Sequence, residues 1–271
     1  LAQPKIALDL DQLHLRADEA RDMQFERLEI KRGSVVLRAS GRDVAQLDAL
    51  DLQGEASSLI GPFKGQGTFA RDEKRVSFRF NTSMVEGERL RFKLISDEMA
   101  TLPRMELDAA FLFDKSPRVE GQLQVTATQP APWRLAGPVT VTAMQAQMES
   151  ADLRMGGEEG ALVLNGQWQW TFAPASVSMQ WQARQLDLDR AREKQPSLPA
   201  LFEMPAATLP LRFSLATPAL IIGGEALSEL SLDLAREANG AMRVKASSAG
   251  PGGARVVVDG QVETGFAAGF Q

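Results

Sequence analysis

The chain has 271 residues, enough for one large or two modest domains with a buried core. Hydrophobic residues make up 44% and charged residues 24%, which excludes a disordered tail and a membrane bundle. With no Cys, no Tyr and one His, the composition excludes most cysteine-ligated metal sites, thiol redox motifs and His-dependent triads. The net charge of -5, with charges of both signs evenly scattered, excludes the basic footprint of a nucleic-acid-binding protein.

Strict alternation of apolar and polar residues dominates the chain from its beginning. Ile6, Leu8 and Leu10 alternate with charged residues, and the pattern returns in most later segments. A period of two is typical of strands with one apolar and one polar face. We count roughly 18 such runs, separated by turn sequences such as Asn239-Gly240, and therefore predict a mainly β protein.

One segment breaks the alternation. Residues 188–195 are good helix formers, and Pro196 and Pro199 then interrupt them, so we expect one or two short connector helices within 188–204. A Pro-rich stretch at 129–132 marks a second boundary. We accordingly divide the chain into a β region over 1–130 and a second β region over 131–271.

An open twisted sheet rarely exceeds about ten strands, so this number of strands requires a way to cover the apolar faces. Stacked sandwiches, a closed barrel and a sheet folded lengthwise like a taco all do so. Alternation alone does not separate the sandwich from the taco.

Several short sequence segments, taken in their order along the chain, resemble segments of a known protein family. They are Leu59–Gly67, Pro132–Gly137, Ala183–Arg190, Leu209–Leu215, Leu220–Leu234, Asn239-Gly240 and Pro251–Arg255. Together they resemble the AsmA-like envelope proteins of Gram-negative bacteria, the later phrases being similar to the C-terminal AsmA-type region. The resemblance implies an elongated, highly twisted antiparallel sheet folded into a taco-like hydrophobic groove. It also implies a periplasmic segment of an inner-membrane-anchored protein that moves phospholipids between the membranes and supports outer-membrane integrity.

The N-terminus begins Leu1-Ala2-Gln3-Pro4-Lys5, without an initiator Met or an apolar signal region. We interpret the chain as a fragment whose membrane anchor is missing. The expected partners are phospholipid or fatty-acid acyl chains, the inner membrane through that anchor, and other envelope proteins.

The candidate site is a lining of apolar side chains, because an acyl chain needs only apolar surface removed from water. No catalytic residue, metal ion or cofactor is expected. The predicted groove-lining residues are Leu8, Leu10, Val76, Phe78, Phe80, Leu90, Phe92, Leu94, Phe111, Phe113, Leu123, Val125, Val139, Val141, Leu162, Leu164, Trp168, Trp170, Phe172, Met179, Trp181, Leu211, Phe213, Leu232, Val244, Val256 and Val258.

Other candidate residues are expected to be structural. His14 has no second His as a metal partner, so we expect its side chain to face solvent. The segment Gly61–Gly67 lacks the spacing of a phosphate loop, so we expect a hairpin bend there. Acidic pairs, which we expect to be solvated, occur at Asp9 and Asp11, at Glu158 and Glu159, and at Asp187 and Asp189.

Two other functions stay open from the sequence. A scaffold for envelope assembly would have a fully packed interior. A carbohydrate-active enzyme would need two carboxylates about 5 to 10 Å apart in a cleft.

Overall fold

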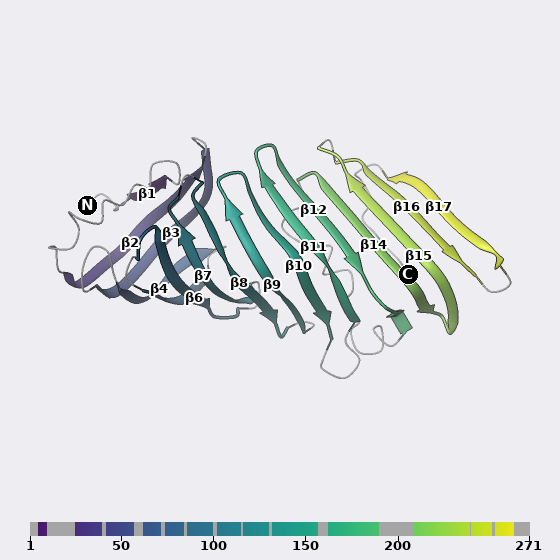
Figure 1. Ribbon diagram of the computed structural model, residues 1–271, viewed down its shortest axis with the longest axis horizontal. Helices are drawn as coiled ribbons and strands as arrows, with labels where there is room; N and C mark the ends of the chain where they lie inside the picture. Colours follow the sequence, from purple (N-terminus) through teal and green to yellow (C-terminus); the bar gives the residue numbers. More distant parts are fainter. Residues whose placement is uncertain are drawn as a thin grey trace. The chain divides into compact units, whose positions relative to one another are not determined.

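Figure 1 shows the computed structural model of the chain. The structure describes residues 5–9, 25–39, 42–56, 62–71, 74–83, 86–99, 102–114, 116–129, 132–156, 162–189, 209–238, 240–250 and 253–262. Strands account for 81% of the structure, and nearly all of their pairings are antiparallel. The predicted mainly β fold class is confirmed.

The described residues form seventeen strands. The first eight are β1 (Lys5–Asp9), β2 (Phe25–Ala39), β3 (Arg42–Ala56), β4 (Phe63–Arg71), β5 (Lys74–Thr82), β6 (Arg89–Ser96), β7 (Arg104–Leu112) and β8 (Arg118–Ala127). The others are β9 (Trp133–Thr142), β10 (Gln145–Met155), β11 (Leu162–Phe172), β12 (Ala175–Gln182), β13 (Leu186–Asp187), β14 (Leu211–Ile222), β15 (Glu225–Arg236), β16 (Met242–Ala249) and β17 (Arg255–Val262).

The chain folds as two compact units. The first contains Leu1–Ala127 and Ala136–Ala146, and the second contains Thr128–Leu135 and Gln147–Gln271. β9 and β10 each contribute residues to both units. The expected boundary after residue 130 stays a prediction.

The first unit is a sequential ladder of strands. From β2 to β8, each strand pairs antiparallel with the next strand along the chain. β1 pairs with β2 in parallel, with Leu8 opposite Leu37. Because antiparallel neighbours can be joined by short hairpins, this order follows directly from the closely spaced runs in the sequence.

The second unit contains one change of direction. β11 and β12 are antiparallel, but β12 and β13 both run parallel to β14, each residue opposite the one 34 positions later. β12 and β13 therefore form a single line along β14, broken at residues 183–185. β14 to β17 then continue as an antiparallel ladder.

The predicted connector lies in the sequence between β13 and β14, which are paired in parallel. Leu188 and Asp189 have helical backbone, and the rest of the predicted helical segment, from residue 190 to residue 204, lies outside the described residues.

The regular pairing of the ladders is interrupted by bulges. Pro218, inside β14, has no N–H to donate, and opposite it β15 bulges at Glu229, whose φ is 56°. The Thr217 hydroxyl donates to the Ala219 carbonyl at 2.9 Å beside this break. Similar bulges with positive φ occur at Arg32 in β2 and Ala49 in β3.

Candidate functional site: the apolar face of each sheet

The strand register of the first unit gathers the apolar residues on one side of the sheet. Phe80 lies opposite Leu94, Leu94 opposite Leu107, and Leu107 opposite Leu123, so one apolar row crosses four strands. Since side chains alternate between faces, residues two positions away lie on the same side. We call this side the first apolar face, formed by Val76, Phe78, Phe80, Leu90, Phe92, Leu94, Met105, Leu107, Ala109, Phe111, Val119, Gly121, Leu123 and Val125.

The second unit repeats this arrangement with tryptophans. Trp168 lies opposite Met179, and Met179 opposite Phe213, which in turn pairs with Leu234. Because this register is kept across the unit, its apolar side chains also share one side of the sheet. This second apolar face is formed by Trp168, Trp170, Phe172, Val177, Met179, Trp181, Leu211, Phe213, Leu215, Leu230, Leu232, Leu234, Val244, Ala246, Val256 and Val258.

Many side chains on these faces keep contact with water. Phe78, Phe80 and Phe92 are half-buried, and Trp170 is 37% exposed. A closed sandwich would bury such large side chains on its inner face. Trp181, which is only 4% exposed, is an exception among the aromatic residues. Within the described residues, each apolar face therefore includes aromatic surface that a ligand can reach.

Glycines opposite aromatic residues shape these faces. Gly65 lies opposite Phe80, Gly67 opposite Phe78, and on β11 Gly166 lies opposite Trp181. A Cβ added at Gly65 would stand 2.7 Å from the Phe80 ring, and one at Gly166 would stand 2.9 Å from the Trp181 ring. Each ring therefore covers the glycine on the neighbouring strand and leaves no space there for a side chain.

Few polar side chains interrupt the apolar faces. Ser96 and Ser248 are each 7% exposed and Thr217 is 2% exposed. The Ser96 hydroxyl accepts the backbone N–H of Met105 at 3.2 Å. No buried side-chain nitrogen or oxygen among the described residues lacks a hydrogen-bond partner. These groups are satisfied by the protein, so none of them indicates a buried polar ligand.

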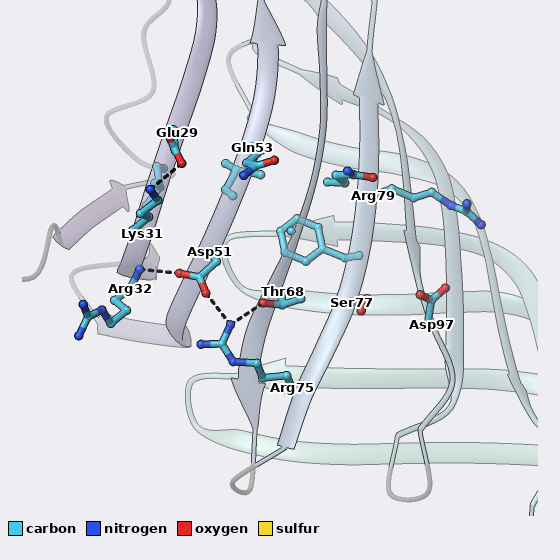
Figure 2. Close-up of a pocket in the computed structure, with 15 residues that line it drawn as sticks. Glu29, Lys31, Arg32, Asp51, Gln53, Thr68, Arg75, Ser77, Arg79 and Asp97 are labelled. Carbon is cyan, nitrogen blue, oxygen red and sulfur yellow. Dashed lines mark hydrogen bonds and ion pairs between the residues drawn. The ribbon is translucent and has the colours of Figure 1, made fainter.

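The opposite side of the sheet in the first unit is polar and contains an open cavity of about 640 Å³ (Figure 2). Asp51 is one of the residues that line it, accepting the backbone N–H of Arg32 at 2.8 Å and pairing with Arg75, which also donates to Thr68. The hydrogen bond from Arg75, and then that from Arg32, hold the pKa of Asp51 below its ordinary value. The cluster joins β2, β3, β4 and β5, and each of its groups has a structural partner.

Among the acidic pairs, Asp189 differs from the expectation of a solvated side chain. The Asp189 carboxylate accepts the backbone N–H groups of Gly223 at 2.7 Å and Gly224 at 2.8 Å, in the turn between β14 and β15. It is therefore a turn-stabilising group rather than merely a solvated one. Asp11, Glu158, Glu159 and His14 lie outside the described residues.

The prediction of a hairpin bend at Gly61–Gly67 is wrong for most of that segment. Residues from Phe63 onward belong to β4, an interior strand of the ladder. Its glycines serve the close approach of Phe78 and Phe80 instead of a bend.

The registers bring most of the predicted lining residues together within their own unit, on the faces defined above. Leu8 lies in β1, and Leu10 is outside the described residues. Leu162 and Leu164 begin β11 and are buried, at 6% and 4% exposed. Phe113 directly follows β7, and its ring packs edge to face against that of Phe111, with 4.4 Å between the ring centroids. Val139 and Val141 share one side of β9 by their spacing.

Sequence reasoning missed the glycine–aromatic pairs and the bulges. The Gly-X-Gly spacing of Gly65 and Gly67, matching that of Phe78 and Phe80 on the next strand, is the signal that could have revealed the pairs. The positive φ at Arg32, Ala49 and Glu229 had no such signal.

The described residues include no helix with the length and apolar character needed to cross a membrane. They also hold no group of three or more His, Asp or Glu side chains able to hold a metal ion. No family model, curated protein or solved structure matches the chain.

Proposed function

We propose that this chain is a non-enzymatic, periplasmic segment of an AsmA-like envelope protein that binds phospholipid or fatty-acid acyl chains on its two apolar faces. The observation that carries the proposal is the unbroken apolar register with accessible aromatic side chains, from Phe80 to Leu123 in one unit and around Trp170 in the other. Such a surface offers an acyl chain contact without offering its headgroup a dedicated site.

The dimensions of each face support this use. Strands lie about 4.8 Å apart, so the seven strands from β2 to β8 extend across about 29 Å. An acyl chain occupies half of a bilayer core that is about 30 Å thick. One acyl chain therefore fits on a single unit, either along or across its strands.

The expected affinity is modest. Complete burial of a methylene group contributes about 0.8 kcal/mol, so an open face covering half of it contributes about 0.4 kcal/mol. A sixteen-carbon chain then gains about 6 kcal/mol, equivalent to a Kd of about 40 µM before ordering costs. Binding assays should accordingly be run at micromolar to millimolar lipid.

The test is binding of a fluorescent fatty acid to the whole chain and to Phe92→Asp and Trp170→Asp. A carboxylate placed on an open face keeps part of its hydration, so both variants should stay folded but bind acyl chains more weakly. Gln122→Asp and Gln182→Asp place the same charge on the opposite faces and should bind as the parent does. Unfolding of both apolar-face variants, or unchanged binding by them, would contradict the proposal.

A scaffold or interaction module for outer-membrane assembly is the second candidate, and the last strand of the second unit favours it. Val256, Val257 and Val258 in β17 are 51%, 64% and 51% exposed. Exposed apolar side chains of this kind offer a partner protein a surface to pack against. A folded chain that binds no acyl chain at any tested concentration would favour this candidate.

A further inference from the structure

A second cavity lies on the polar side of the first unit and has a strongly basic lining. Its volume is about 620 Å³, and it shares Gln53, Gln66 and Arg79 with the cavity in Figure 2. Four cationic side chains line it against the single carboxylate of Glu55; they are Arg27, Lys64, Arg79 and Lys93. The chain as a whole carries a net charge of -5, so this excess of positive charge is local.

The register concentrates three of these cations. Lys64 on β4 lies opposite Asn81 on β5, and Asn81 lies opposite Lys93 on β6. Arg79 is two residues from Asn81 on the same side of β5. Neighbouring strands are about 4.8 Å apart, so the flexible side chains of Lys64 and Lys93 can reach a common anion above Asn81.

Carboxylates lie near these three residues without forming close ion pairs with them. Lys64 lies opposite Glu55, and Lys93 lies opposite Asp108. Arg104 above all, and then Lys93 and Arg79 through space, hold the pKa of Glu106 below its ordinary value. Within the described residues, Lys64, Arg79 and Lys93 make no ion pair and no side-chain hydrogen bond. The nearby Glu106 is held by Arg104, whose Nε and Nη2 atoms donate to its Oε1 at 3.1 and 2.6 Å. Arg27, by contrast, pairs with Glu29 at 3.6 Å and contributes less to the excess.

We propose that this basic pocket, centred on Lys64, Arg79 and Lys93, binds a phosphorylated small molecule through its phosphate group. The Arg guanidinium and Lys ammonium groups are side chains that bind phosphate oxygens. The three positive charges less the negative charge of Glu55 leave two, which balance a phosphate dianion. The cavity exceeds the needs of inorganic phosphate, and the amides of Gln53, Gln66 and Asn81 suit the hydroxyl groups of an organic part such as a sugar.

The cationic side chains of this site and the apolar side chains of the acyl-chain proposal lie on opposite sides of one sheet, although Phe80 of the first apolar face also lines the cavity. Phe92 and Lys93 are adjacent in β6 and belong to opposite sides. Phe92→Asp should therefore weaken acyl-chain binding and leave phosphate binding unchanged, and Lys93→Gln should do the reverse. Failure of one proposal is thereby distinguished from failure of the other.

The experiment is calorimetric titration of the whole chain with glucose 6-phosphate at low salt, alongside glucose and inorganic phosphate. We expect glucose 6-phosphate to bind, added salt to weaken it, and glucose not to bind. Lys93→Gln and Arg79→Gln should each weaken binding roughly tenfold, as loss of one charge-assisted hydrogen bond does. Lys245→Gln removes the same charge from the second unit and should bind within about twofold of the parent.

Each contrary result overturns a defined part of the proposal. No binding of glucose 6-phosphate, or full binding by both Lys93→Gln and Arg79→Gln with unchanged thermal stability, refutes the site. If inorganic phosphate binds as tightly as glucose 6-phosphate, the proposal that the site also recognises an organic group is refuted. Binding only to vesicles that contain phosphatidic acid, and to no soluble ester, places the phosphate in a lipid headgroup and refutes a small-molecule ligand.

Discussion

Replacing Gly166 by Ala tests whether the glycine–aromatic pairs support the sheet. A Cβ at this position would stand 1.9 Å from the Gln180 carbonyl oxygen and 2.9 Å from the Trp181 ring. Replacing Gly by Ala reduces the conformational entropy of the unfolded chain, which stabilises the folded protein by about 0.4 to 1 kcal/mol. Overpacking of the folded protein costs about 1 to 3 kcal/mol. Because the carbonyl contact involves backbone that cannot rotate away, we expect the overpacking to dominate, with a net loss of about 1 to 2 kcal/mol.

Urea unfolding followed by tryptophan fluorescence measures this loss. All four tryptophans, at 133, 168, 170 and 181, lie in the second unit, so the signal reports on that unit alone. With a denaturant slope of about 2 kcal/mol per molar, the midpoint should fall by roughly 0.5 to 1 M. Gly260→Ala is the matched control, because a Cβ at this strand glycine meets nothing within 4 Å. An unchanged midpoint for Gly166→Ala, or an equal fall for Gly260→Ala, would refute the reasoning.

Two further substitutions test the polar contacts. Asp189→Ala should cost about 1 to 2 kcal/mol and speed amide hydrogen exchange at Gly223 and Gly224, because both N–H groups lose their acceptor; unchanged exchange there would contradict the assignment. The pKa of Asp51 is lowered in the folded chain, so its contribution to stability is present above the unfolded value and is lost as pH falls through the lower folded value. Asp51→Asn should therefore lower the melting temperature at pH 6 more than at pH 2, and an equal loss at both would count against the Arg75 contact.

The sequence predicts the strands and their apolar faces well, because both depend on a local period of two. Phe78 and Phe80, or Trp168 and Trp170, fall on one side of a strand whatever lies beside it. The registers that align them with Leu94 or Met179 need the whole ladder, and alternation does not encode them. For this reason the sequence indicated which residues share one side of a strand without indicating their neighbours.

Features that depend on contacts between distant residues escaped sequence analysis. Asp189 was expected to be solvated, because nothing in its own surroundings places the turn at Gly223 and Gly224 beside it. The basic pocket was missed for the same reason, since Lys64 and Lys93 meet only through the pairing of three strands. Gly65 was misassigned to a bend because its partner, Phe80, lies on another strand.

The sequential pairing of strands has a consequence for how such a chain can change in length. Within the described residues, each strand from β2 to β8 pairs with the strands before and after it in the chain. Stability in this arrangement is approximately a sum of local strand terms and nearest-neighbour terms. A hairpin added or deleted in the middle of the ladder would preserve the alternation of faces and require no new core. Long and short versions of this architecture can therefore arise by duplication or loss of hairpins, with the width of the apolar face changing by about 10 Å for each hairpin.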